Sequence, residues 1–385
     1  MDPTALSDPL PLAKSLIRRR SVTPVDDGCL AVLEGTLRSL GFNCRRLPFG
    51  VVENLYARRG VTGRNLCFAG HLDVVPPGEE ASWSRPPFSA EVHDGVLWGR
   101  GAADMKGCVA AWVAALARVL GEGEPEGSLS LLITLDEEGP ALDGTRRVVE
   151  LLQAEGERID GCVVGEPSSL ASVGDQLKVG RRGSLNAWIT VHGRQGHVAY
   201  PERAANPIGP LIELLHRLQA RVLDQGWPEF PPSNLEVTTI DVANPATNVI
   251  PPSATGRLNI RFNPAHRGAE LIDWLSRECA EAEAGFDGRV TLETLLSGEA
   301  FLTEPGPFLD AVTSAVASVT GIPPAWSTTG GTSDARFIRG LCPVVELGLV
   351  GTTIHQIDER VPVADLERLA EVYAAVIRGF FEPAA

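Results

Sequence analysis

The sequence predicts an α/β protein with two domains. Up to about residue 179, apolar runs typical of strands alternate with helical patterns, and this alternation predicts a mixed, mostly parallel sheet flanked by helices. From Gly180 the order changes to strand, helix, two strands and helix, which predicts a small antiparallel sheet with helices on one face. The length of 385 residues also exceeds what one ordinary hydrophobic core holds together.

The spacing of apolar residues places the individual elements. Leu12, Leu16 and Ile17 recur at helical spacing, and SLNAWITVH at 184–192 alternates as a half-exposed strand does. We expect helices at 11–20, 29–40, 107–120, 145–155, 210–222 and 269–284. We expect strands at 43–47, 54–58, 65–69, 96–98, 130–135, 162–164, 184–192, 236–242, 254–262 and 343–349.

Charge and composition exclude several classes of partner. The chain has 34 Lys and Arg against 49 Asp and Glu, a formal net charge of −15, which argues against nucleic acid or an anionic membrane surface. No apolar run approaches the roughly 18 to 20 residues of a membrane span, and no secretory signal opens the chain. The seven cysteines form no CxxC pair and are expected to be reduced core residues. We therefore expect a cytoplasmic protein.

Histidine and acidic side chains follow the predicted strands where these end. His71 and Asp73 lie two positions apart, so a strand tip would present both on one face, and Asp104 follows the run 96–98. Further candidates follow other strands: Asp136, Glu137, Glu138, Glu166 and His355. A lone H-x-D is more often a hydrogen-bonded turn, but five strand-like segments that each end in a candidate ligand favour a metal site.

The donor types indicate the kind of ion. Histidine nitrogen and carboxylate oxygen without thiolate suit a divalent cation, of which zinc is the usual occupant. Three successive acids at 136–138 are costly unless a cation or proton compensates them. These ligands exceed the needs of one ion, whereas two ions about 3.5–4 Å apart with a bridging carboxylate would use most of them. A remaining carboxylate would be a general base.

Blocks of sequence along nearly the whole chain resemble one family. They are SVTP (21–24), CFAGHLDVVPPG (67–78), WSRPPFSAEVHDGVLWGRGAADMKG (83–107), LLITLDEEG (131–139), VVGEPSS (163–169), GRRGS (180–184), GRQGHVAYPERAANPI (193–208), NVIP (248–251), GGTSDARF (330–337) and ELGLVGTTIHQIDE (346–359). On these blocks the chain is identified as a member of the two-zinc peptidase and deacylase family that includes aminoacylases, carboxypeptidases and acetylornithine deacetylase.

The resemblance implies a site with two Zn²⁺ ions per subunit, for which Co²⁺ can substitute. It implies five metal ligands: His71 and Glu166 on one ion, Glu138 and His355 on the other, and Asp104 bridging both. It also implies that Glu137 is the general base and that Asp73 orients the His71 imidazole.

The resemblance further implies how the domains are connected. The catalytic domain would comprise residues 1–179 and 296–385, and residues 180–295 would be an inserted, α+β ferredoxin-like lid through which a homodimer forms. In relatives, the histidine corresponding to His197 comes from the partner subunit's lid and hydrogen-bonds the substrate carbonyl oxygen as charge develops there. From the residues alone, an ordinary loop histidine is the alternative.

The implied substrate class is an anionic N-acyl amino acid, which an acidic protein must bind with local cationic or polar groups. We expect substrate contacts from Arg181, Tyr200, Asn248, Arg261 and Thr332. Solvated arginines are the alternative for the two basic residues. The branch most similar to this chain carries Asn four residues before the last metal-binding histidine, where this chain has Gly351, and Leu72 replaces the usual Thr or Ser.

The leading function is metal-dependent hydrolysis of an amide bond, with Glu137 accepting a proton from the attacking water. The amide would join a short acyl group to an amino acid. Within catalysis, the alternatives are a deacylase for a different acyl group and a dipeptidase. From another class, the chain could be a non-catalytic binding module, but the complete ligand set with its base argues against that.

Overall fold

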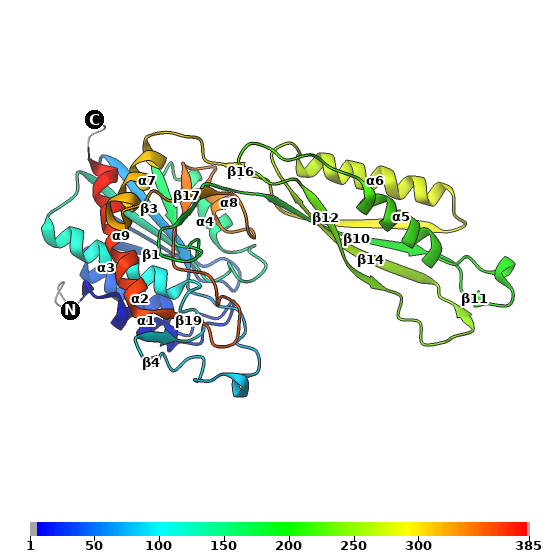
Figure 1. Ribbon diagram of the computed structural model, residues 1–385, viewed down its shortest axis with the longest axis horizontal. Coiled ribbons are helices and arrows are strands. Elements are labelled where there is room, and N and C mark those ends of the chain that lie inside the picture. The colour runs from blue at the N-terminus through cyan, green and yellow to red at the C-terminus, as the bar shows by residue number, and fades with distance from the viewer. Residues whose placement is uncertain (1–5, 383–385) are drawn as a thin grey trace. The chain divides into compact units, whose positions relative to one another are not determined.

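The computed structural model describes residues 6–382 and divides into two compact units (Figure 1). The first unit contains the described residues up to Val179, Thr303–Ser327 and the chain from Ser333 onward. The second unit contains Gly180–Leu302 and Thr328–Thr332. Across the described part of the chain, every helix is too short or too polar to cross a lipid bilayer.

A sheet of eight strands forms the centre of the first unit, in the order β1-β2-β6-β3-β7-β18-β8-β17. The strands are β1 (Asn43–Arg46), β2 (Leu55–Arg59), β3 (Arg64–His71), β6 (Gly127–Thr134), β7 (Gly161–Val164), β8 (Gln176–Lys178), β17 (Ala325–Ser327) and β18 (Val344–Glu346). The pairs β6-β3, β3-β7, β7-β18 and β8-β17 are parallel, and the other three pairs are antiparallel. The predicted mixed, mostly parallel sheet is confirmed.

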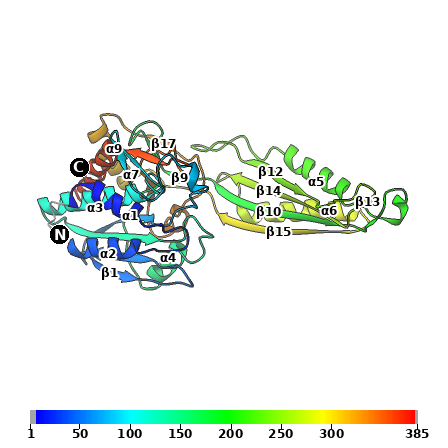
Figure 2. The ribbon, with the colours of Figure 1, turned by 90° about the horizontal axis from the view of Figure 1, so that it is seen from below.

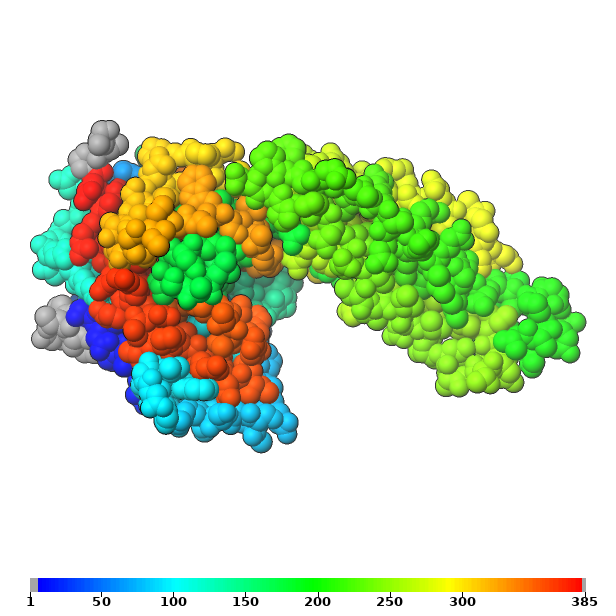
Figure 3. All heavy atoms as spheres, in the orientation of Figure 1, coloured from blue at the N-terminus to red at the C-terminus, as the bar shows by residue number. Residues whose placement is uncertain are grey.

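Helices cover both faces of this sheet, as Figure 2 shows. One layer consists of α1 (Pro9–Ile17), α3 (Lys106–Glu122), α7 (Pro307–Thr320) and α9 (Val363–Phe381), and α7 and α9 lie side by side at the surface in Figure 3. The other layer consists of α2 (Cys29–Ser39), α4 (Thr145–Ala154) and the short α8 (Ala335–Ile338). Because helices cover both faces, β3 and β6 are buried almost throughout.

Aromatic side chains join the sheet to the first helical layer. The Phe68 ring stacks on Trp112 with 4.7 Å between centroids, and Tyr373 meets both rings edge-on. The Tyr373 hydroxyl donates a hydrogen bond of 2.6 Å to the Leu347 carbonyl oxygen. Trp112 is fully buried within this aromatic cluster.

A smaller sheet of three strands lies beside the main one, in the order β19-β5-β4. Its strands are β4 (Val92–His93), β5 (Val96–Trp98) and β19 (Arg360–Pro362). The antiparallel pairing of β5 with β19 joins two segments that are far apart in the sequence. A 3-10 turn, η2 (Glu80–Ser82), precedes this sheet.

The second unit is built on an antiparallel sheet in the order β12-β14-β10-β15. Its elements are β10 (Gly183–His192), α5 (Ile208–Ala220), β12 (Asn234–Asp241), β14 (Ser253–Phe262), α6 (Gly268–Ala284) and β15 (Arg289–Gly298). This βαββαβ order is ferredoxin-like. Leu215 of α5 and Trp274 of α6 share one buried cluster with Leu185 and Leu258 of the sheet.

Shorter pairs complete the second unit. They are β9 (Gly180–Arg181) with β16 (Phe301–Leu302) and β11 (Gly196–His197) with β13 (Val249–Ile250), and η3 (Pro201–Arg203) follows β11. Strand β15 has no counterpart among the predicted strands. Its residues are intermediate or exposed on both faces, so the alternation that identifies a half-buried strand is weak there.

Candidate metal centre

The main sheet brings the predicted ligands together at one edge. His71 ends β3, the acidic run 136–138 follows β6, and Glu166 follows β7. Strands β6, β3, β7 and β18 are neighbours in that order and run parallel, so their carboxyl ends meet at the same edge. The loop after β18 adds His355, and the loop between β5 and α3 adds Asp104.

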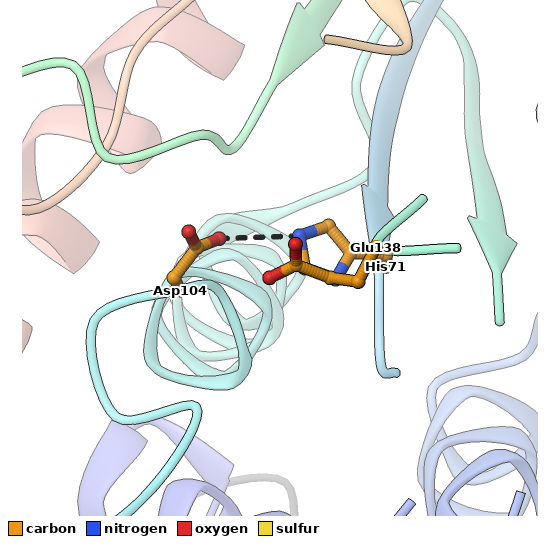
Figure 4. A group of neighbouring side chains, drawn as sticks. All are labelled: His71, Asp104 and Glu138. Atoms are coloured by element: carbon orange, nitrogen blue, oxygen red, sulfur yellow. Dashed lines mark hydrogen bonds and ion pairs between the residues drawn. The ribbon is translucent and has the colours of Figure 1, made fainter. Parts of the chain in front are cut away.

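Asp104 lies between the two histidines. Its Oδ1 is 3.2 Å from His71 Nε2 and its Oδ2 is 3.4 Å from His355 Nε2, so each oxygen faces a different imidazole. His71 Nε2 is also 3.6 Å from Glu166 Oε1, and His355 Nε2 is 3.0 Å from Glu138 Oε1. Figure 4 shows the Asp104 and Glu138 carboxylates directed toward the His71 ring. Each histidine thus has Asp104 and one further carboxylate near its Nε2 atom.

The donor set fits divalent cations. Ligand atoms of His71, Asp104 and Glu138 lie within 4.8 Å of one another, and so do those of His71, Glu137 and Glu166. In the described part of the chain, Glu166 Oε1 is buried and accepts no hydrogen bond, although a buried carboxylate oxygen normally requires a partner. Imidazole nitrogen with carboxylate oxygen is a ligand set of zinc sites.

Asp73 holds two of the neighbouring groups in place and is not itself a proposed metal ligand. The Asp73 backbone oxygen is 2.9 Å from His71 Nδ1, so a proton on Nδ1 leaves the Nε2 lone pair for the centre. The Asp73 carboxylate accepts hydrogen bonds from the backbone N–H of Glu138 at 3.1 Å and of Glu137 at 3.5 Å. Its Oδ1 is 3.6 Å from His71 Nδ1. The backbone of Asp73 therefore orients His71, and its side chain holds the turn that carries Glu137 and Glu138.

Crowding perturbs the proton affinities of these groups. Burial raises the pKa of Glu137 well above its usual value, and burial together with the Asp104 charge does the same for Glu166. Hydrogen bonds to Asp104 and Glu138 raise the pKa of His355 to about 10. Burial lowers the pKa of His71, but its hydrogen bond to Asp104 and neighbouring carboxylates outweigh burial, and the net pKa is well above the usual value. The centre thus attracts positive charge.

The substrate-binding candidates all lie in the second unit, at three separate places. His197, Tyr200 and Asn248 gather around the β11-β13 pair, where the His197 and Tyr200 side chains are exposed and their ring centroids are 5.8 Å apart. Arg181 donates from Nη1 to the Thr329 carbonyl oxygen at 3.1 Å, next to the segment that contains Thr332. Arg261 lies on β14 opposite Ser184.

Two buried charged residues next to the centre were not predicted from the sequence. Arg100 and Glu359 are 2% and 0% exposed and form an ion pair of 2.7 Å beside the Asp104 loop. Their positions in the sequence could have indicated them, because Arg100 lies in the turn GRG just before Asp104 and Glu359 lies four residues after His355.

Known proteins share this architecture. A family model described as peptidase family M20/M25/M40 matches residues 67–379. The chain is 62% identical over 374 residues to the succinyl-diaminopimelate desuccinylase of Caulobacter vibrioides (strain NA1000 / CB15N). The matched region covers 97% of this chain and 96% of that protein.

Solved structures share the fold at low identity. An M20 family metallo-carboxypeptidase from Sulfolobus solfataricus is 17% identical with a TM-score of 0.80, covering 96% of this chain and 98% of that one. A Bacillus subtilis protein described as a dinuclear metal-binding peptidase of the M20 family is 15% identical with a TM-score of 0.75, covering 98% of this chain and 99% of that one.

We expect Asp104→Ala to weaken the binding of two metal ions at once, because its two oxygens face different histidines. His71→Ala and His355→Ala should each weaken one ion chiefly. Calorimetric titration of metal-free protein with zinc should show losses of at least about tenfold. Glu150→Gln, whose carboxylate pairs with Arg146 on the surface, is the control. Unchanged stoichiometry and affinity in Asp104→Ala would exclude the bridging role.

The stability of metal-free protein should fall as pH rises from 6.5 to 9. His355, with a folded-state pKa of about 10 against an ordinary 6.5, contributes stability below pH 6.5 that is lost through this range, and His71 acts in the same direction. Melting temperatures of chelated and zinc-loaded protein at both pH values test this. The decrease should be larger after chelation, and equal decreases would show that these groups do not control it.

Proposed function

The chain belongs to the peptidase family M20/M25/M40, and on that premise we propose that it hydrolyses the amide bond of N-succinyl-L,L-2,6-diaminopimelate. The products are succinate and L,L-2,6-diaminopimelate. The observation that carries this proposal is the 62% identity over nearly the whole chain to a succinyl-diaminopimelate desuccinylase. The enzyme is a metal-dependent amidohydrolase, and we place it in the cytoplasm, in lysine and diaminopimelate biosynthesis.

Two Zn²⁺ ions are the proposed cofactor, with Co²⁺ as a substitute. His71 and Glu166 would hold one ion, Glu138 and His355 the other, and Asp104 both. When bound, the ions polarise the amide carbonyl and lower the pKa of the attacking water. The observed separations support this assignment, because His71 Nε2 lies 3.6 Å from Glu166 Oε1 and His355 Nε2 lies 3.0 Å from Glu138 Oε1.

Glu137 is the proposed general base. Its carboxylate lies with His71 and Glu166 at the centre, and its backbone is fixed by Asp73. It takes a proton from the attacking water and passes it to the leaving amine nitrogen, so one carboxylate serves as base and then as acid. Burial favours this second step because it raises the pKa of Glu137.

The second unit is proposed to be a lid through which two subunits pair. His197 is exposed on the β11-β13 pair, where it could be presented to a substrate. We assign it the stabilisation of negative charge on the substrate oxygen, in the active site of the other subunit of a homodimer. Arg181 and Arg261 would bind substrate carboxylates, and Tyr200, Asn248 and Thr332 would add polar contacts.

A different acyl specificity was the main alternative, because Gly351 replaces Asn. A Cβ at Gly351 would lie 3.2 Å from the Pro167 carbonyl oxygen, so a side chain would press on the segment that follows Glu166. The identity to the C. vibrioides desuccinylase supports the succinyl substrate over an acetylated amino acid or a dipeptide. It also supports an enzyme over a binding module.

Kinetics on zinc-loaded protein test the substrate. We expect kcat/KM to be highest for N-succinyl-L,L-2,6-diaminopimelate and to fall by orders of magnitude for N-acetylornithine and for dipeptides, because buried polar groups left unpaired by a wrong substrate discriminate strongly. Heat-inactivated protein and zinc alone are the controls. Faster turnover of the acetylated amino acid or a dipeptide would contradict the proposal.

We expect Glu137→Gln to keep its metal and lose turnover by at least about 10²–10⁴-fold, because the isosteric amide cannot accept a proton. Metal content and kcat are the two measurements, with Glu150→Gln as the control. Near-normal kcat with full metal would show that Glu137 is not the base.

Mixed dimers test whether His197 acts across the subunit interface. His197→Ala and Glu137→Gln subunits, each inactive alone, should regain activity when subunits exchange, because one site of the mixed dimer then receives an intact base and an intact histidine. Native mass spectrometry confirms the exchange. Mixed dimers as inactive as their parents would place His197 in its own subunit's site or outside catalysis.

A further inference from the structure

A buried carboxylate outside the proposed ligand set binds the loop that carries Asp104. Glu359 Oε2 accepts hydrogen bonds from Arg100 Nη1 at 2.7 Å and from the Gly101 N–H at 3.0 Å. Glu359 Oε1 accepts from the N–H groups of Ala103 at 2.9 Å and Asp104 at 3.1 Å. Each carboxylate oxygen thus has two donors, all from the segment between β5 and α3. Both carboxylate oxygens of Glu359 are therefore occupied by hydrogen-bond donors of this loop, so Glu359 is not a candidate metal ligand.

The same residue lies on the loop that carries His355. The Gly99 N–H donates to the Glu359 carbonyl oxygen at 2.9 Å, and β19, which begins with Arg360, pairs with β5. His355 and Asp358 have φ values of +60° and +64°, in the left-handed region that residues other than glycine adopt infrequently. Such conformations persist where the surroundings hold them, and Glu359 is part of what holds this loop.

Contacts at the surface fasten the His355 loop to two other segments, the loop before β4 and the strand β5. The Asp358 carboxylate accepts from the Ser84 N–H and hydroxyl, both at 2.7 Å. The Arg360 guanidinium lies 4.8 Å from the centre of the Trp98 ring, and the Thr353 hydroxyl donates to the Arg360 carbonyl oxygen at 3.0 Å. The His355 loop is therefore anchored at the surface, and Glu359 joins it to the Asp104 loop in the interior.

Stability alone does not account for a charged pair at this depth. Arg100 and Glu359 are almost fully buried, and removing two charges from water costs about as much as their attraction returns. The attraction between the two charges alone therefore stabilises the unit no more than an apolar pair of similar volume would. What an apolar pair could not provide is an acceptor for three backbone N–H groups next to Asp104.

We infer that Glu359 is a positioning residue, which sets the Asp104 backbone and ties it to the His355 loop so that the Asp104 oxygens meet both histidines. The inference rests on the proposed function, in which Asp104 and His355 hold the ions. Asp104 Oδ1 at 3.2 Å from His71 and Oδ2 at 3.4 Å from His355 are the distances that it maintains. Residues that orient metal ligands in this way commonly change metal affinity about 10–100-fold.

Glu359→Gln tests the inference with little change of shape. A glutamine must turn its NH₂ toward either the Arg100 and Gly101 donors or the Ala103 and Asp104 donors, so one pair loses its acceptor. Zinc titration of metal-free protein by calorimetry should show both equivalents weakened about 10–100-fold. At saturating zinc, kcat should return toward the wild-type value with KM unchanged, because Glu359 does not touch substrate.

Ile377→Val is the matched control for lost stability. Ile377 is fully buried in α9 of the same unit and is not among the residues of the centre, so the variant should melt at a lower temperature with unchanged zinc affinity. If Glu359→Gln does not fold, Arg100→Met with Glu359→Met replaces the pair without leaving a buried unpaired charge. It should fold and bind zinc about tenfold or more weakly.

Three outcomes would overturn the inference, and they separate it from the proposed function. A folded Glu359→Gln or double variant with wild-type zinc affinity would show that Glu359 does not position the ligands, while wild-type turnover of the succinylated substrate would leave the function intact. Wild-type protein that binds no zinc and hydrolyses no substrate would overturn both. A loss of kcat that saturating zinc does not restore would also contradict positioning through the metal ligands.

Discussion

The repulsion among the carboxylates that follow β5, β6 and β7 is the constraint on which the metal centre of the first unit depends. Asp104, Glu138 and Glu166 meet within a few ångströms of His71, largely out of water, where like charges interact strongly. Raised pKa values of Glu166 and His71 are the local response of protein groups to this crowding. The proposed ions would remove the repulsion altogether, and the surrounding structure must keep the ligands close until they bind.

The unit keeps the ligands close with carboxylates that bind backbone rather than cations. Asp73 accepts the N–H groups of Glu137 and Glu138, and Glu359 accepts those of the Asp104 loop. A backbone N–H is a fixed dipole that cannot leave or titrate, so it compensates a buried carboxylate without competing for the metal. Both supports act on loops at strand ends, where the sheet no longer fixes the chain.

The sequence predicted the strand ends and the residue types of the centre, because apolar runs and the donors that follow them are local features. It could not predict the order β6-β3-β7-β18, which depends on how distant segments cross over. The family resemblance implies that Asp73 orients the His71 ring. In the structure the Asp73 backbone oxygen makes the hydrogen bond to that ring, and the Asp73 carboxylate accepts one from the Glu138 N–H. Glu359 was not predicted, because an acid in a polar loop resembles a solvated one until tertiary packing buries it.

The two units have different proposed roles, so metal affinity and turnover depend on different parts of the chain. All proposed metal ligands and both supporting carboxylates lie in the first unit, whereas His197 and the substrate-binding candidates lie in the second. Metal affinity is therefore set by packing within one unit, where small displacements of Asp104 or His355 alter ligand geometry. In the proposed function, turnover also uses groups of the second unit, among them His197 on the exposed end of β11. A change confined to the second unit should accordingly leave zinc binding intact while abolishing hydrolysis, whereas a change at Glu359 acts on hydrolysis only through the metal.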